Sequence, residues 1–120
     1  TGGIVRGNTF DGRGISGQNY ADSWVDAQGN GYLIEENIGT YVRTNGSVFV
    51  DGYQTHVLLD GWGCGNVFRA NKSDLGGVGN YAFNIQDNLT ACADQPNVVY
   101  GSNSVTNAVT GLSNIPLSSE

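Results

Sequence analysis

The stretch HVLLDGWGCGNVFRAN, residues 56–71, contains the only His of the chain, one of its two Trp and one of its two Cys. Its closing block, a short apolar run that ends at an Asn, recurs along the chain. The four copies are GGIVRGN (2–8), GYLIEEN (31–37), NVFRAN (66–71) and NVVYGSN (97–103), and their final asparagines lie 29, 34 and 32 residues apart. The stretch is therefore first of all a repeat unit, on which rare residues are inserted.

A second block precedes three of these copies. It reads SWVDAQGNG (23–31), HVLLDGWGCG (56–65) and YAFNIQDN (81–88), and it places Asp26 and Asp60 each 11 residues before the next repeat asparagine. Short β-branched blocks separated by Gly-rich corners, without helical periodicity, indicate strands. A repeat of about thirty residues built in this way predicts an all-β fold, a parallel β-helix (β-solenoid) of about four coils.

The composition agrees with this fold and narrows the partners. The chain has 120 residues, of which 19 are Gly and 13% are charged, so residues that favour long helices are scarce. A formal net charge of −6 with five basic residues disfavours nucleic acid and anionic membranes as partners. The same charge disfavours a polyanionic sugar unless Ca²⁺ bridges it. Low charge and a pair of Cys favour an extracellular setting.

The repeat predicts which side chains stack between coils. The four asparagines, Asn8, Asn37, Asn71 and Asn103, are expected to form a turn ladder in left-handed geometry, and a ligand site is the weaker reading. Two positions before them, Glu35 is expected to lie between Arg6 and Arg69. The direct meaning of that column is charge neutralisation and register, and a catalytic role for Arg69 is the alternative.

The corners contain two further predicted contacts. Asp26 and Asp60 are expected to stack, either solvated at a corner or sharing a Ca²⁺ ion. Cys64 and Cys92 lie in consecutive Gly-rich corners, and stacked corners would bring them within disulfide distance. A redox or metal role for these Cys is disfavoured, because neither CxxC nor clustered His is present.

The two ends of the sequence differ. The pattern fades in residues 104–120, which contain Pro116, and these residues are expected to form a C-terminal edge or tail. The first repeat opens without a capping segment. Residues 1–120 are therefore expected to be one β-helix segment, the C-terminal part of a longer solenoid, with further coils of the same precursor or another copy at the N-terminal edge.

The repeats carry a resemblance to a known family. GGIVRGNTFDGRGISGQNYADSWVDAQGNGYLIEEN, DGYQTHVLLDGWGCGNVFRANKSDLGG and PNVVYGSNSVT together resemble secreted right-handed parallel β-helix repeat proteins of bacteria and fungi, in the pectin-lyase-like superfamily. The resemblance covers nearly the whole chain. It implies a right-handed coil, secretion and further coils upstream. It leaves the activity open among polysaccharide lyases, glycoside hydrolases, epimerases and non-catalytic adhesins.

The candidate functional residues follow from this range of activities. A lyase of this superfamily needs a base and a charge neutraliser, and the candidates for catalysis are His56, Asp60 and Arg69, although a lone His is more often structural. Trp62, Tyr53 and Trp24 are the candidates for stacking on sugar rings. Two functions remain: a secreted module that binds polysaccharide or another partner without being a complete enzyme, or part of a polysaccharide lyase or glycoside hydrolase.

Overall fold

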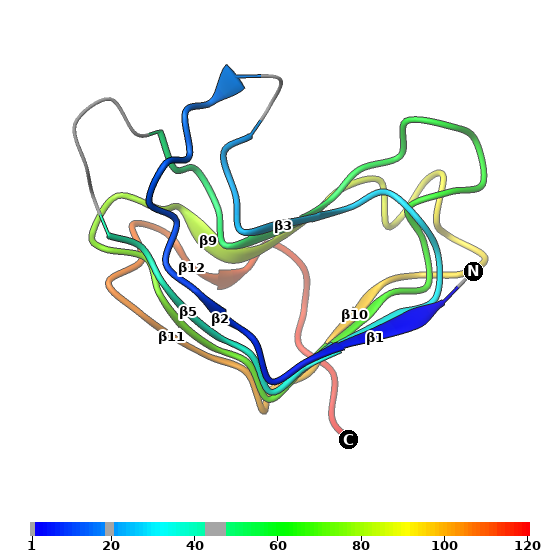
Figure 1. Ribbon diagram of the computed structural model, residues 1–120. Coiled ribbons are helices and arrows are strands. Elements are labelled where there is room, and N and C mark those ends of the chain that lie inside the picture. The colour runs from blue at the N-terminus through cyan, green and yellow to red at the C-terminus, as the bar shows by residue number, and fades with distance from the viewer. Residues whose placement is uncertain (1, 19–20, 43–47) are drawn as a thin grey trace.

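The computed structural model describes residues 2–18, 21–42 and 48–120 and shows an all-β parallel solenoid (Figure 1). Three four-stranded sheets run along the solenoid. Sheet A contains β1 (Gly3–Arg6), β4 (Tyr32–Glu35), β7 (Val67–Arg69) and β10 (Val98–Val99). Sheet B contains β2 (Thr9–Phe10), β5 (Ile38–Thr40), β8 (Lys72–Asp74) and β11 (Ser104–Thr106). Sheet C contains β3 (Val25–Ala27), β6 (Tyr53–Thr55), β9 (Tyr81–Ile85) and β12 (Gly111–Ser113).

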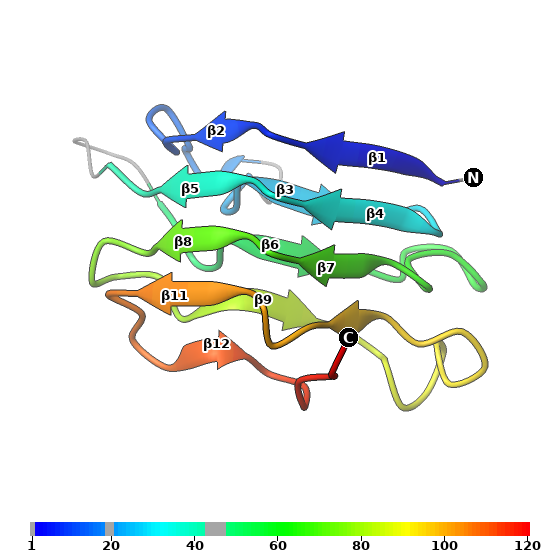
Figure 2. The same ribbon diagram turned by 90° about the horizontal axis from the view of Figure 1, so that it is seen from below.

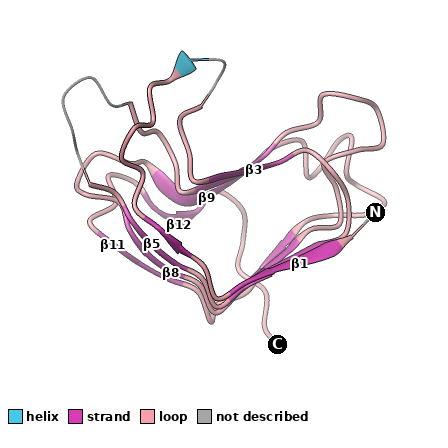
Figure 3. Cartoon of the chain, in the orientation of Figure 1, coloured by secondary structure: helices cyan, strands magenta, loops and turns pink. Residues whose placement is uncertain are grey.

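The chain visits sheets A, B and C in order and then returns to sheet A one strand further along (Figure 2). Every paired strand in the three sheets is parallel to its neighbour. The four strands of each sheet amount to about three turns of the chain. Strands and loops make up nearly all of the described chain (Figure 3), and none of its described helices is long and apolar enough to cross a membrane.

The core is an aromatic and aliphatic column inside the coils. Ile34, Phe68 and Val99 enter it from sheet A, and Tyr53 and Phe83 enter it from sheet C. The rings of Tyr53 and Phe83 stack with centroids 4.9 Å apart, as expected for residues at the same position of consecutive coils. Alternation along the strands leaves the neighbouring residues on the outer faces.

The asparagine ladder at the corner between sheets A and B is confirmed. The backbone N–H of each upper Asn donates to the Oδ1 of the Asn below, at 3.0 Å for Asn8 to Asn37, 3.1 Å for Asn37 to Asn71 and 2.9 Å for Asn71 to Asn103. The left-handed residue, however, is not the Asn itself. It is the residue before it, with φ 69° at Gly7, 56° at Glu36 and 55° at Ala70. That turn aims the Asn side chain along the ladder.

The charge column on the outer face of sheet A is also confirmed. Glu35 is only 3% exposed and pairs with both Arg6 and Arg69, with 2.6 Å between Arg69 Nη1 and Glu35 Oε1. Arg69 also binds Glu120 at 2.8 Å, so positive and negative side chains alternate along four positions. Hydrogen bonds from the guanidinium groups of Arg6 and Arg69 lower the pKa of Glu35, and their positive charges add to this effect.

Strand β10 is shifted by one residue relative to the repeat asparagines, so Val99 lies beside Phe68 and faces the core. One expected register is corrected. Asp26 lies beside Gln54, not Asp60, because residues 56–65 form an outward loop instead of a strand that stacks on Asp26. The matching distance of 11 residues was therefore a coincidence of loop lengths.

The predicted tail is shorter than expected. Residues 104–106 form β11 and residues 111–113 form β12, so sheets B and C continue through most of it. The remaining residues return to sheet A, where Ser118 forms a parallel bridge with Tyr100.

Candidate functional site on the outer face of sheet C

A row of polar side chains lies on the outer face of sheet C. Asp26 on β3 is in register with Gln54 on β6, which is in register with Asn84 on β9. Their neighbours along the strands, Ala27, Tyr53 and Phe83, belong to the core, so the polar row points the other way. Three consecutive coils therefore each contribute one hydrogen-bonding side chain to a single line.

His56 lies at the end of β6 and joins this row. Its Nδ1 is 2.5 Å from Oδ1 of Asp26 in the preceding coil, and each side chain is 23% exposed. The backbone N–H of His56 donates to the carbonyl of Ala27, which fixes the two coils at this point. In the tautomer with the proton on Nδ1, the Nδ1–H donates a hydrogen bond to Asp26 and Nε2 has a free lone pair. Nothing within the described residues forms a hydrogen bond with Nε2.

Asp51 supports the row from beneath. It is fully buried, and its carboxylate accepts hydrogen bonds from Gln54 Nε2 at 2.9 Å, Asn84 Nδ2 at 3.0 Å and the backbone N–H of Tyr81 at 3.1 Å. A buried carboxylate needs such donors, since an unpaired one is costly. The network holds the amide groups of Gln54 and Asn84 in one orientation.

Asp22 is a second carboxyl group beside this network. Burial raises its pKa above the ordinary value of 3.8, a hydrogen bond from Gln54 opposes that effect, and the carboxylates of Asp51 and Asp26 add to it. Its Oδ1 is buried without a hydrogen-bond partner. The site therefore combines one imidazole with three neighbouring carboxyl groups, and it is locally acidic.

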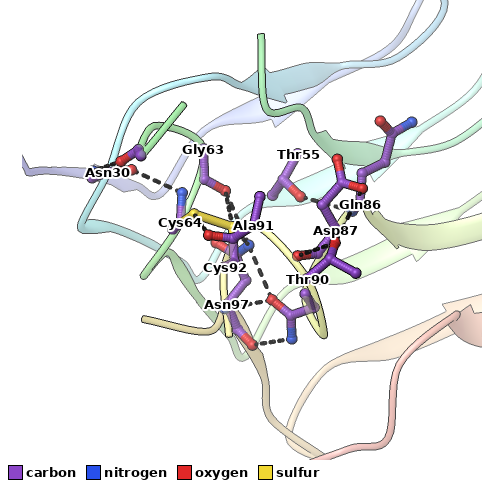
Figure 4. Close-up of a disulfide and its surroundings, with 12 residues drawn as sticks. Asn30, Thr55, Gly63, Cys64, Gln86, Asp87, Thr90, Ala91, Cys92 and Asn97 are labelled. Atoms are coloured by element: carbon purple, nitrogen blue, oxygen red, sulfur yellow. Dashed lines mark hydrogen bonds between the residues drawn. A yellow bond between two sulfur atoms is a disulfide. The ribbon is translucent and has the colours of Figure 1, made fainter. Parts of the chain in front are cut away.

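Loops rise away from the solenoid interior on both sides of sheet C (Figure 1). On the side of His56, residues 56–65 form one of these loops, and the Cys64–Cys92 disulfide ties it to the loop of the next coil, with a Cα–Cα distance of 5.3 Å. The predicted disulfide is thus confirmed. Asn30 accepts a hydrogen bond from the N–H of Cys64 and donates one to the carbonyl of Gly61. Figure 4 shows the disulfide and the hydrogen bonds around it.

A second asparagine ladder holds the same corner and escaped the sequence analysis. Asn66 donates to Asn97 at 2.9 Å, and Asn97 donates to Asn88 at 2.7 Å, each through the backbone N–H. The side chain of Asn66 also accepts the N–H of Tyr32. The signal in the sequence was an Asn just before two apolar blocks, at Asn66-Val67 and Asn97-Val98.

The predicted catalytic residues are not all brought together. His56 lies on sheet C, Asp60 is exposed in the loop that follows it, and Arg69 lies on sheet A, where Glu35 and Glu120 occupy its guanidinium. The structure instead places His56 against Asp26, which the sequence suggested as a metal ligand. Asp26 and Asp60 do not stack, and within the described residues no group of three His, Cys, Asp or Glu side chains could hold a metal ion. The residues do not fit the Ca²⁺ site considered from the sequence.

The three candidate aromatic residues lie in different environments. Tyr53 is 0% exposed, because its ring is a member of the core column. Trp24 packs against the rings of Phe10, Phe49 and Tyr53. Tyr53 is thus a core residue, and Trp24 is partly buried against the core. Trp62 is 42% exposed on the loop beside His56, and with Leu58 and Leu59 it gives this loop an apolar tip.

Asp22, Asp51, Gln54 and Asn84 are the site residues that the sequence did not reveal. Their selection required the register of sheet C, which follows DGYQT (51–55) and not the more conspicuous HVLLDG (56–61).

Comparison with known proteins gives one informative match. No protein-family model matches the chain, and no curated protein matches it significantly. The crystal structure of an alginate lyase from Paenibacillus sp. str. FPU-7 superposes with a TM-score of 0.74 and 34% sequence identity. The match covers 92% of this chain and 34% of the lyase, so the chain spans about a third of the length of that protein. The two proteins share the parallel β-solenoid fold over nearly all of this chain.

Proposed function

We propose that this chain is a segment of a secreted, right-handed β-helix of the pectin-lyase type that acts on an extracellular polysaccharide of the alginate class. The outer face of sheet C would bind the sugar chain, and His56 would be the base of a lyase reaction. The observation that carries the proposal is the 2.5 Å contact between His56 Nδ1 and Asp26 Oδ1, which orients a half-buried imidazole on that face. The similarity to an alginate lyase supports the substrate class.

The chemistry of a lyase fits a base of this kind. In β-elimination from a uronate, the base takes the proton from the carbon next to the carboxylate. The electron pair of that C–H bond forms a C=C bond. The C–O bond to the glycosidic oxygen breaks, its electron pair goes to that oxygen, and the oxygen takes a proton from water. A neutral imidazole has a lone pair that accepts a proton, so it is suited to the first step. Asp26 would act as a positioning residue that stabilises the imidazolium formed.

The acidity of the site limits what this chain does alone. Asp22, Asp26 and Asp51 oppose the binding of a carboxylated sugar, and Arg69 is held on another face. The positive group that neutralises the sugar carboxylate would therefore come from outside these residues, with the active site shared between this chain and further coils. The whole protein would then catalyse the reaction, and this segment would supply only part of the active site.

A binding module without catalysis is the second candidate. It is favoured by the exposed loop tip with Trp62, Leu58 and Leu59, which could pack on the apolar face of a sugar ring, and by the surplus of carboxylates around the only His.

The test separates the two functions in the full-length protein. With alginate as substrate and the ultraviolet absorbance of the unsaturated product as readout, His56→Gln is expected to lower kcat by about 100-fold or more while Kd changes by less than about twofold. Trp62→Ala is expected to weaken binding instead. Lys72→Gln, on the outer face of sheet B, is the matched control and should change neither. Full activity in His56→Gln contradicts the role of His56 as the base. If the parent protein binds alginate but releases no unsaturated product, the result supports a binding module without catalysis.

A further inference from the structure

Asn30 and Gly31 form an Asn-Gly pair at the corner where the chain passes from sheet C to sheet A. The pairing of Leu33 with Val67 places Asn30 at the position that Cys64 occupies in the next coil. In such a pair, the backbone nitrogen of the glycine can attack the side-chain amide of the asparagine, since no Cβ hinders its approach. Asn30 is half-buried and Gly31 is exposed, so water reaches this corner.

Hydrogen bonds to the loop of residues 56–65 hold both reacting groups of the pair (Figure 4). Nδ2 of Asn30 donates to the carbonyl of Gly61 at 2.8 Å, and Oδ1 accepts the N–H of Cys64 at 2.8 Å. The N–H of Gly31 donates to the carbonyl of Cys64 at 3.2 Å. Deamidation requires the side chain of Asn30 to turn toward the nitrogen of Gly31 and that nitrogen to lose its proton. These bonds oppose both changes, so the pair reacts only after it has separated from the loop.

The Cys64–Cys92 disulfide keeps the end of this loop in place. Both cysteines are buried, and the bond ties the loop to the next coil. At Gly63, an added Cβ would lie 2.3 Å from the carbonyl oxygen of His56, so the loop closes on itself just before Cys64. The carbonyl of Gly63 also accepts Nδ2 of Asn97 at 3.0 Å. The disulfide and this hydrogen bond therefore fix the groups that face the Asn-Gly pair.

We propose that Asn30 is a modification site whose deamidation is controlled by the Cys64–Cys92 disulfide. While the bond is intact, the loop protects the Asn-Gly pair. A dithiol reductant opens the bond by thiol–disulfide exchange, and it is oxidised to its own disulfide as Cys64 and Cys92 become thiols. The released pair then reacts with water, and Asn30 becomes aspartate or isoaspartate while ammonia leaves.

The covalent step consumes one molecule of water. The nitrogen of Gly31 gives its proton to the solvent, and its electron pair forms a bond to Cγ of Asn30. The bond from Cγ to Nδ2 breaks, its electron pair goes to Nδ2, and this nitrogen takes up a proton and leaves as ammonia. Water then opens the resulting succinimide ring. Cleavage of the new bond to Cγ gives aspartate, and cleavage of the original peptide bond gives isoaspartate.

The product cannot restore the contacts of Asn30. A carboxylate has no N–H for the carbonyl of Gly61, so two oxygens would face each other where a hydrogen bond now lies. Isoaspartate adds a carbon atom to the backbone before Gly31, which moves its N–H away from the carbonyl of Cys64. The loop, with the exposed Trp62, therefore stays less tightly held after the disulfide forms again. A single reduction leaves a permanent covalent mark.

The test follows deamidation by mass. The parent protein, the parent with dithiothreitol, and the Cys64→Ser, Cys92→Ser variant are incubated in mildly alkaline buffer made with heavy-oxygen water, which labels the product. Peptide mapping separates Asn30 from Asn45, the asparagine of the other Asn-Gly pair, which lies outside the described residues. Asn30 is expected to react at least about tenfold faster in the reduced parent and in the variant than in the oxidised parent.

Two controls separate release of the corner from unfolding of the whole chain. A peptide of residues 28–33 gives the rate without protection, which the variant should approach and the oxidised parent should not. Amide exchange at Asn71 should stay slow in the variant, since the ladder at the other corner is intact. Asn30→Asp, with the disulfide present, imitates one product and should speed amide exchange in residues 56–65 by about threefold or more.

Three results would overturn the proposal. The first is an equal rate at Asn30 in the oxidised and reduced proteins, whether slow or as fast as in the peptide. The second is faster deamidation that comes with fast exchange at Asn71, because the whole fold would then have opened. The third is unchanged exchange in residues 56–65 of Asn30→Asp, which would remove the lasting effect. The readouts are mass and amide exchange, so a negative result with polysaccharide has no bearing on Asn30.

Discussion

The chain turns at two kinds of corner that differ in construction. One lies between sheets A and B, and the other lies between sheets C and A. At the first corner, the first three coils place a left-handed residue before an Asn that bonds to the next Asn. At the second, residues 56–65 and 86–96 form long loops held by a disulfide and by a separate set of asparagines. Repetition at one corner fixes the fold, and variation at the other frees the chain to place His56 and Trp62.

The largest effect is expected from breaking the repeated corner. Asn71→Ala removes an Oδ1 that accepts the N–H and Nδ2 of Asn37, and an Nδ2 that donates to Ile34 and Asn103. Because the buried hydrogen-bond partners of Asn71 are left unpaired, the free energy of unfolding measured with urea should fall by about 3 kcal/mol. Asn80→Ala, at an exposed position, is the control and should change stability by less than about 0.5 kcal/mol. Equal losses at both positions would mean that the ladder has no special weight.

The variable corner should depend on its covalent bond. The disulfide closes a loop with a sequence separation of 28. In the chain-entropy model, such a bond raises the free energy of unfolding by about 3.5 kcal/mol. This figure is an upper limit, because the folded state relaxes when the bond is lost. In the Cys64→Ser, Cys92→Ser variant, amide exchange should accelerate in residues 56–65 and stay slow at Asn71. Uniform acceleration across both corners would show that they are not independent.

A smaller effect separates the backbone of the repeated corner from its side chains. Ala70 holds φ at 55° and Gly7 holds it at 69°, in equivalent positions of two coils. Ala70→Gly should raise the free energy of unfolding by about 0.5–1 kcal/mol, because glycine adopts a positive φ without the steric penalty of alanine. The greater freedom of glycine in the unfolded chain offsets part of that gain. Gly7→Ala should lose a similar amount, since nothing lies within 4 Å of an added Cβ and only the backbone resists. Both are measured by urea denaturation, and a change of the same sign in the two variants would contradict this account.

The smallest effects are opposite changes of stability with pH, caused by Glu35 on sheet A and Asp22 beside sheet C. The pKa of Glu35 is lowered by Arg6 and Arg69, so its contribution is present above its ordinary value of 4.5 and is lost as pH falls through the lowered value. Glu35→Gln should therefore be less stable than the parent at neutral pH, and the difference should shrink in acid.

Asp22 should show the reverse. Its pKa is raised by burial, so the protein loses stability as pH rises from the ordinary value of 3.8 through the raised one. Asp22→Asn should be at least as stable as the parent at neutral pH, with the advantage vanishing below pH 3.8. Thermal unfolding at a series of pH values measures both variants, and parallel pH curves for the two would contradict the assignment of opposite shifts.

The sequence predicted what repeats and missed what does not. The ladder of Asn37 and Asn71, the Glu35 column and the disulfide follow from positions that recur at a similar spacing. Residues 56–65 form a loop outside the sheet and do not follow the repeat. The sequence therefore aligned Asp60 with Asp26, whereas the neighbour of Asp26 in the sheet is Gln54.

The missed site residues share a physical reason. Asp51 is important because it is buried beneath three donors, and burial at a single position has no periodic signal. Tyr53 was assigned to the surface for the complementary reason: an aromatic residue in an alternating strand faces either way until the register is known.

The direction of the hydrogen bonds in the asparagine ladder bears on how such a protein changes length. Each ladder Asn donates to the Asn below it and to the strand above it, so every internal coil makes the same set of bonds with its neighbours. Duplication or deletion of one whole coil in the gene leaves the bonding of the remaining coils unaltered. Evolution can therefore lengthen this kind of solenoid in single-coil steps while the loops beside His56 diverge on their own.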